Sequence, residues 1–342
     1  MGKYFFIFII IAALSLPACG GMKTGGAPAT LKIGLVAPFE GLHRPLGYEA
    51  LYGVKLALQE RNLAGDVGGY QVELVALNDF DDSLEAEAQA RALIADPDVV
   101  GVIGHLSSAT TQAALPVYRK AGLAVVIPWS VAAEVDLGPS GVVSVAANLA
   151  ETEAQLKTMG QALGFEQITP LTNSGFDSIS AGTQALWLDT EGVTAGEMLV
   201  SLRQAGITLP VLGQVEAGSP QTLQVAQEAA AGFIFVSPSP DPRQVNEAAS
   251  FVAAYQALAG FPPGPRALLA YDATQVLLEA IKQSISDKHI PVRAKVAAAL
   301  AMVHHQGLSG SIAFDRLGRR VAAPVWIYQI TDKTYPGALV TP

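Results

Sequence analysis

The stretch GHLSSATTQ, residues 104–112, follows the apolar run VVGVI and opens a segment with helical character. The apolar run predicts a buried strand that ends at Gly104, and the hydroxyl-rich residues predict a helix that begins near Ser108. Ser and Thr side chains cap helices by accepting hydrogen bonds from the unpaired N–H groups of the first turn. The same N–H groups and the helix dipole can hold an anion, and ligands of open α/β sheets bind at the carboxyl ends of strands. The junction is therefore either a simple cap or one wall of a ligand site.

From Leu31 onward, short β-rich runs alternate with longer segments of helical periodicity. This alternation is typical of an α/β fold in which helices cover the faces of parallel sheets. The glycine-rich segment GDVGG (65–69) predicts the end of the first helix. In the first half of the chain we expect strands at 32–38, 71–77, 99–104 and 123–129, and helices at 46–62 and 84–95.

The chain begins with MGK, a 13-residue apolar run and the sequence LPAC. A membrane-spanning helix needs about 20 apolar residues, so we interpret residues 1–18 as a lipoprotein signal peptide rather than a permanent span. Cys19 follows a small residue at the end of this segment, which resembles a bacterial lipoprotein processing site where the thiol receives lipid. The alternative is an ordinary signal with an incidental cysteine. Glycine-rich residues 19–30 predict a flexible tether.

Composition excludes several classes of protein. Half of the 342 residues are apolar and only 15% are charged, so the part after the tether is long and apolar enough for two domains with large cores. The net charge of −9 and the lack of a basic run argue against a nucleic-acid partner. Because Cys19 is the only cysteine, neither a disulfide framework nor a cysteine-based metal site is available.

Motifs for catalysis and metal binding are mostly missing. The sequence has no G-x-G-x-x-G after a strand, no P-loop, no nucleophile elbow and no H-E-x-x-H. His304 and His305 are adjacent and lack the i, i+4 spacing of a helical ligand pair. Asp79, Asp81 and Asp82 lack the glycine and distal glutamate of an EF-hand, which favours a solvated strand-to-helix cap over a calcium loop. No metal or cofactor is expected.

Five stretches fit one known family in the same order along the chain. They are residues 32–41, 77–90, 104–118, 202–213 and 307–330. These stretches resemble the leucine/isoleucine/valine-binding protein family, the type I periplasmic solute-binding proteins of ABC transporters. The resemblance implies two Rossmann-like lobes with parallel central sheets, joined by a three-stranded hinge.

The resemblance also implies that the chain crosses between the lobes near residues 141–155, 235–242 and 313–326. Only the second crossing shows in the sequence itself, as the proline-rich break FVSPSPDP. Discontinuous lobes are therefore expected: lobe I from 31–147 plus 241–311, and lobe II from 148–240 plus 312–342.

Lobe II is where the sequence departs most from the family. Between residues 165 and 184 the chain is too short for the additional strand and helix that the family has there. Either the lobe has lost a βαβ unit, or this segment rearranges to cover an exposed sheet edge, since an unpaired edge strand invites association. We predict a reduced second lobe.

Carried over residue by residue, the resemblance places the family's carboxylate-binding serine at Ser108, with His105, Leu106 and Ser107 alongside. In the loop 128–135 the family's threonine falls at Val131, with Ser130 one position earlier. The family's aromatic contact falls at Glu191, and its acidic ammonium partner falls within one residue of Glu216. Three further residues either line a cleft or form core edges: Trp129, Arg266 and Tyr271.

These implications point to a lipid-anchored, extracytoplasmic receptor that closes two lobes around a small molecule. The resemblance implies an amino acid as ligand, branched-chain or related, and an ABC permease or a membrane sensor as partner. A secreted α/β enzyme, a hydrolase or a dinucleotide enzyme, is the alternative. A zwitterion needs both charges paired when it is buried, so Ser108 is expected to face its carboxylate and Glu216 its ammonium.

Overall fold

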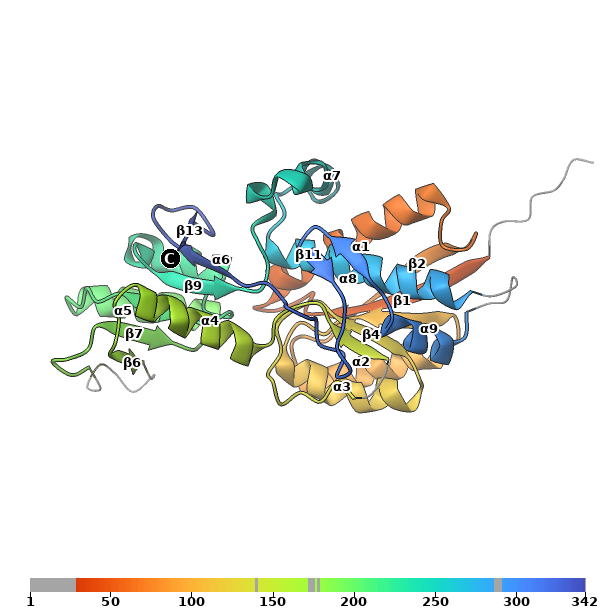
Figure 1. The fold of residues 1–342 in the computed structure, drawn as a ribbon, viewed down its shortest axis with the longest axis horizontal. Helices are drawn as coiled ribbons and strands as arrows, with labels where there is room; N and C mark the ends of the chain where they lie inside the picture. Colours follow the sequence, from red (N-terminus) through yellow and green to blue (C-terminus); the bar gives the residue numbers. More distant parts are fainter. Residues whose placement is uncertain (1–28, 139–140, 172–175, 177–178, 286–290, 342) are drawn as a thin grey trace, which may run out of the picture.

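The computed structural model describes residues 29–138, 141–171, 176, 179–285 and 291–341. Two α/β lobes lie next to one another along the long axis of the molecule, which confirms the predicted fold class (Figure 1). The signal peptide expected at 1–18, Cys19 and nearly all of the expected tether lie outside the described residues. Of the helices in the described ranges, none combines the length and apolar character of a membrane span.

The first lobe is built on a five-stranded sheet with the order β2-β1-β3-β4-β5, in which all neighbours are parallel. Every residue of β3 and β4 is buried, as expected for central strands with helices on both faces. The sheet confirms the strands expected in the first half of the chain. Its strands are β1 (Thr30–Ala37), β2 (Gln71–Asn78), β3 (Val99–Ile103), β4 (Ala124–Ile127) and β5 (Val142–Ser144).

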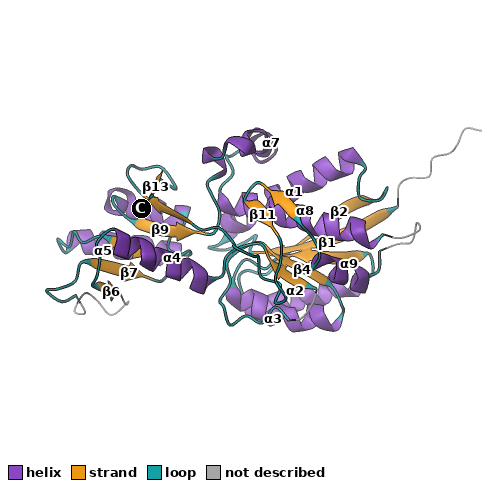
Figure 2. Cartoon of the chain, in the orientation of Figure 1, coloured by secondary structure: helices purple, strands orange, loops and turns teal. Residues whose placement is uncertain are grey.

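Two sets of helices cover this sheet (Figure 2). On one face lie α2 (Ser83–Ala95) and α3 (Ser108–Lys120). On the other lie α1 (Arg44–Ala64), α8 (Pro265–Ser284) and α9 (Arg293–Leu300), with α7 (Ala249–Ala259) packed against α1. The predicted glycine stop is confirmed, because Gly65 ends α1 in the left-handed conformation that glycine adopts without strain.

The second lobe is built on a six-stranded sheet with the order β13-β12-β9-β8-β7-β6. β6 to β9 are parallel, whereas β12 and β13 are antiparallel to their neighbours. α4 packs on one face, and α5 with α6 on the other. The elements are α4 (Leu149–Ala162), β6 (Ile168–Pro170), β7 (Ala185–Leu188), α5 (Gly192–Gln204), β8 (Val211–Gly213), α6 (Pro220–Ala226), β9 (Ile234–Ser237), β12 (Trp326–Gln329) and β13 (Ala338–Leu339).

The alternation of strands and helices breaks between β6 and β7. The described residues between Pro170 and Ala185 contain no helix, and this is the short segment noted in the sequence. At the other end of the sheet, β12 and β13 from the end of the chain extend it beyond β9. The direct succession of β6 and β7 is what the predicted reduction of this lobe expects.

The chain passes between the two sheets three times: after β5, after β9 and before β12. The 3-10 turn η1 (Gln227–Ala230) precedes β9 in the second lobe. The turns η2 (Pro242–Gln244) and η3 (Asn246–Ala248) follow the second passage, and the third passage follows the hairpin of β10 (His305–Gly307) and β11 (Gly310–Ile312). A backbone bridge joins Ser144 to Arg319, so the first and third passages lie side by side.

A buried polar cluster, formed by Arg320, Asp272 and Ser309, ties these passages to the first lobe. Arg320 donates to the carbonyl oxygens of Ser309, Ser311 and Val145, and to the Ser309 hydroxyl. Asp272 accepts hydrogen bonds from the Ser309 N–H and hydroxyl at 2.8 and 2.6 Å. We call these three residues the hinge cluster. Each is at most 4% exposed, so the cluster is buried and its polar groups are paired within the protein.

Candidate ligand-binding site

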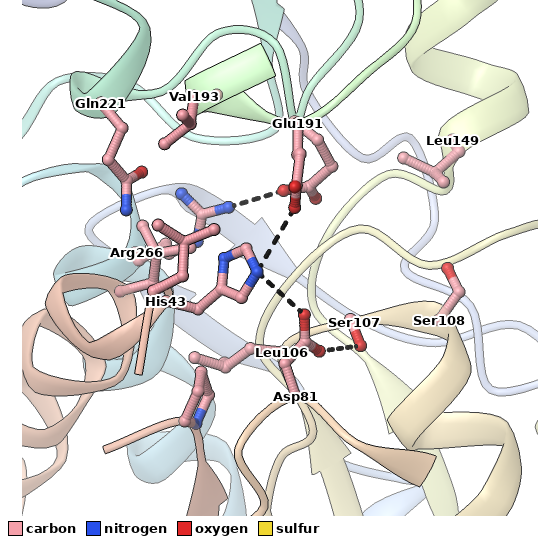
Figure 3. Close-up of a pocket in the computed structure, with 15 residues that line it drawn as sticks. His43, Asp81, Leu106, Ser107, Ser108, Leu149, Glu191, Val193, Gln221 and Arg266 are labelled. Atoms are coloured by element: carbon pink, nitrogen blue, oxygen red, sulfur yellow. Dashed lines mark hydrogen bonds and ion pairs between the residues drawn. The ribbon is translucent and has the colours of Figure 1, made fainter. Parts of the chain in front are cut away.

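A cavity of about 140 Å³ lies between the lobes, and both lobes line it (Figure 3). Its apolar surface comes from both sides, as do its charges. The lining residues are Pro38, Leu42, His43, Leu46, Asp81, Leu106, Ser107, Ser108 and Arg266 from the first lobe, and Leu149, Glu191, Gly192, Val193, Glu216 and Gln221 from the second.

The N-terminus of α3 forms one wall of this cavity. Ser107 is the N-cap and Ser108 is the first helical residue, so the predicted strand end and helix start are confirmed. The Ser107 hydroxyl accepts a hydrogen bond from the Thr110 N–H, while the Ser108 hydroxyl accepts one from the Ala132 N–H at 2.8 Å. Within the described residues, the N–H groups of Ser108 and Ala109 have no acceptor in the protein. They are therefore available to a ligand, as the sequence suggested.

The turn after β2 adds a carboxylate to the same wall. Asp82 caps α2 as predicted, by accepting from the N–H groups of Leu84 and Glu85. Asp81 instead lines the cavity, and its Oδ1 accepts a hydrogen bond from the Ser107 hydroxyl at 2.6 Å. The φ of Asp81 is +59°, a left-handed conformation that aspartate tolerates better than most residues.

The interpretation of this turn as a solvated cap is wrong for Asp79, because its side chain is fully buried. Its Oδ2 lies 2.7 Å from His105 Nδ1, and the other ring nitrogen of His105 lies 3.2 Å from the Tyr118 hydroxyl. Burial raises the pKa of Tyr118. Asp79 also accepts from the Asp81 N–H. His105 thus lies behind the cavity and helps to hold the turn that carries Asp81.

Arg266, at the start of α8, supplies the one guanidinium among the described cavity residues. Its backbone N–H donates to Glu49, a buried carboxylate from α1 whose pKa is raised by burial. The guanidinium carbon lies 3.9 Å from the ring centroid of Trp129, a cation–π contact. Its Nη2 donates to Glu216 Oε2 at 3.1 Å, which joins the two lobes.

Two more contacts cross between the lobes. The Trp129 Nε1–H donates to Glu216 Oε1 at 3.1 Å. His43, just before α1, has its Nε2 3.3 Å from Glu191 Oε2 and 3.7 Å from Asp81 Oδ2. Glu191 and Glu216 have about half of their side chains exposed, in contrast to the hinge cluster. We call Arg266, Trp129, Glu216, His43 and Glu191 the cleft cluster.

The structure brings only some of the predicted residues to the cavity. Leu106, Ser107, Ser108, Glu191, Glu216 and Arg266 line it. Trp129 lies beneath Arg266, whereas Ser130 and Val131 are buried and not among the lining residues. The Ser130 hydroxyl donates to the Ala147 carbonyl. Tyr271 is not among the lining residues; it packs on Phe251 and donates to Glu60.

Several lining residues were not singled out from the sequence, notably His43, Leu149 and Gln221. His43 and Leu149 adjoin the starts of helices that follow strands in the chain, β1 and β5 respectively. Ligand sites of parallel α/β sheets gather at such strand-to-helix connections, so this position was a usable signal. Asp81 was considered only as part of a calcium loop or a helix cap.

This chain is similar to known proteins in both sequence and structure. The sequence profile of the periplasmic binding proteins matches residues 30–168 and 151–334. The leucine-, isoleucine-, valine-, threonine-, and alanine-binding protein of Pseudomonas aeruginosa is 25% identical over 336 residues, covering 85% of this chain and 87% of the relative.

Solved structures agree with this fold. The LivJ substrate-binding protein of a branched-chain amino acid transporter from Streptococcus pneumoniae, in complex with isoleucine, matches with a TM-score of 0.78 at 21% identity, covering 92% of this chain and 100% of that one. The leucine-binding protein LivK from Thermotoga maritima matches with a TM-score of 0.79 at 22% identity, covering 91% and 99%.

Two parallel-sheet lobes joined by three passages, with a cavity between them, define a binding protein of the type I periplasmic fold. This chain belongs to the periplasmic binding protein family. The resemblance found in the sequence is thereby confirmed.

Proposed function

We propose that this protein is an extracytoplasmic receptor that captures a small molecule between its lobes and presents it to an ABC permease. The observation that carries the proposal is the cavity lined by both lobes. A ligand there contacts both lobes at once, so it stabilises their closed arrangement relative to the open one. A cavity of about 150 Å³ holds a molecule the size of benzene, so the ligand is expected to be small.

An amino acid is the proposed ligand. The free N–H groups of α3, next to Ser108, suit a carboxylate, and the carboxylates around the cavity suit an ammonium. Leu42, Leu106 and Leu149 offer contacts to an aliphatic side chain. The names of the relatives in Pseudomonas aeruginosa and Streptococcus pneumoniae, which refer to branched-chain and related amino acids, support this choice.

A panel of the twenty standard amino acids tests the ligand. A ligand that binds only the folded protein raises its melting temperature by mass action, and titration calorimetry then gives the affinity. The proposal expects a subset of aliphatic amino acids to bind without chemical change, as judged by mass spectrometry after incubation. Conversion of a bound compound would favour the secreted enzyme instead.

Cys19 is the proposed site of a lipid anchor, and the glycine-rich residues between it and β1 are the proposed tether. Cys19→Ala should move the protein from the membrane fraction to the soluble extracytoplasmic fraction of the producing cells. A wild-type protein that is soluble and lacks lipid by mass spectrometry would exclude the anchor. Loss of ligand uptake in cells without the protein supports delivery to a permease, whereas unchanged uptake with a lost transcriptional response supports a membrane sensor.

A further inference from the structure

Five charged or ionisable side chains face the cavity, and most of them are acidic (Figure 3). Asp81, Glu191 and Glu216 are carboxylates, against the guanidinium of Arg266 and the imidazole of His43. Three carboxylates thus face at most two cations, so this set carries an excess of negative charge. A carboxylate that is removed from water needs a compensating cation, so the ligand is the group that can supply it.

Glu216 already has such a cation within the protein. Its Oε2 accepts from the Arg266 guanidinium and its Oε1 from the Trp129 indole. Arg266 is 4% exposed and is held in place by Glu49 and the Trp129 ring, so its charge stays next to Glu216. Glu216 is therefore occupied in holding the lobes together.

Asp81 and Glu191 have no such partner among the described lysines and arginines. They approach the cavity from opposite lobes, and the imidazole of His43 lies between them. Closing the lobes brings these two carboxylates toward one another, which costs free energy unless a positive charge joins them. A cationic ligand removes that cost only in the closed arrangement.

The neighbourhood of Asp81 also fits the shape of an amino acid. The ammonium and the carboxylate of an α-amino acid are attached to the same carbon, so their partners must lie close together. Asp81 is hydrogen bonded to Ser107, the N-cap of α3, and the free N–H groups of that helix follow directly. An acceptor for the ammonium and donors for the carboxylate therefore lie side by side on the first lobe.

We propose that the ligand carries a cationic amine and that Asp81 and Glu191 hold it, one from each lobe. This inference rests on the proposed function. It assigns the amine to Asp81 and Glu191 and not to Glu216. Glu216 with Arg266 then serves to hold the closed lobes together. The class of ligand is an amine with a small aliphatic group, of which a branched-chain amino acid is one member.

Titration calorimetry with three related probes tests the assignment. L-leucine carries both charges, 4-methylpentanoic acid lacks the amine, and 3-methylbutylamine lacks the carboxylate. The wild-type protein should bind L-leucine at least about tenfold more tightly than 4-methylpentanoic acid, a difference of about 1.4 kcal/mol. Asp81→Asn and Glu191→Gln should each remove most of this preference, and Glu197→Gln, an exposed position on the same helix α5, should leave it unchanged.

Glu216→Gln decides between the two assignments. It should weaken binding of all probes by the same factor, because it loosens the lobes and leaves the amine contacts in place. Loss of the amine preference in Glu216→Gln, but not in Glu191→Gln, would overturn the proposal. Glu191 is half exposed, so its variant is expected to fold even if that of Asp81 does not.

The probes also separate this inference from the proposed function. Binding of 3-methylbutylamine but not L-leucine would reject the amino acid and keep the amine contacts. Binding of 4-methylpentanoic acid as tightly as L-leucine would overturn the amine contacts and keep a solute receptor. Binding of neither amine-bearing probe would also overturn the assignment.

Discussion

The hinge cluster and the cleft cluster both join parts of the chain that are far apart in sequence, but they differ in the exposure of their carboxylates. Arg320, Asp272 and Ser309 are buried and their partners lie around the passages between the lobes. Glu216 and Glu191, in contrast, are about half exposed, and their partners lie across the cavity. Water can replace the partners of exposed groups at little cost, but not those of buried ones. We therefore expect the hinge cluster to determine stability and the cleft cluster to determine closure.

The largest expected effect is on the hinge cluster. Arg320→Met removes a buried cation and leaves the Ser309 hydroxyl and three carbonyl groups without their donor. Breaking a buried charged network by removing one member costs about 3 to 5 kcal/mol, and urea denaturation should show a loss of unfolding free energy of this order. Arg316→Met, at an exposed position in the same passage, is the matched control. A loss of unfolding free energy no larger than that of Arg316→Met would contradict the expectation that the hinge cluster determines stability.

Ser108→Ala should act on binding. It removes a hydroxyl that faces the cavity, and a hydrogen bond to a charged ligand group is worth about 1.5 to 3 kcal/mol. Titration calorimetry with L-leucine should show a loss of binding free energy of this size. Ser107→Ala is the comparison, because losing the N-cap of α3 should lower stability by about 1 kcal/mol. Equal affinities for the Ser108 variant and the parent would remove Ser108 from the ligand site.

Glu216→Gln should change the free energy of unfolding by less than about 1 kcal/mol, because an ion pair with an exposed partner contributes little to stability. It should instead shift the lobes toward the open arrangement, which small-angle scattering detects as a larger radius of gyration without ligand. Saturating ligand should reduce the radius of the parent. A loss of stability as large as that of Arg320→Met, with an unchanged radius, would place Glu216 with the hinge cluster.

The smallest expected effect is a pH dependence next to the hinge cluster. Burial lowers the pKa of His305 below its usual value of 6.5, so the unfolded chain binds a proton more readily than the folded one. Stability should therefore fall as the pH drops below about 6.5, and denaturation at about pH 7.5 and about pH 5.5 measures the change. His305→Gln should reduce this fall more than His304→Gln, whose side chain is exposed. Identical pH profiles for the two variants would exclude His305 as a source.

The first lobe was predictable because it follows simple periodicities, whereas the two-lobe arrangement was predicted from the family resemblance alone. The strands from β1 to β4 are apolar runs, α1 shows apolar residues at helical spacing and ends at a glycine, and α2 begins after the Asp82 cap. The passages between the lobes were harder. Arg320 and Asp272 are charged residues in buried positions, and only their mutual proximity in the folded chain explains that burial.

The candidate site was predictable where it depends on one local junction, and less so where it depends on both lobes. Ser107 and Ser108 follow directly from the strand end and helix start. The partners of Glu216 could not be read from the sequence, because Trp129 and Arg266 are 87 and 50 residues away along the chain. At Val131, a position matched to the family's ligand contact, the side chain is packed into the core.

The short strand β6 affects how this protein can associate with a second copy of the chain. β6 is at the margin of its sheet, and the Leu171 N–H donates inward to the Trp187 carbonyl of β7. Because successive N–H groups of a strand point in opposite directions, the nitrogen of Pro170 faces outward, and proline has no hydrogen to donate there. A second chain that approached this margin would lack one of the hydrogen bonds needed to continue the sheet. At high protein concentration, Pro170 thus disfavours polymerisation through β6.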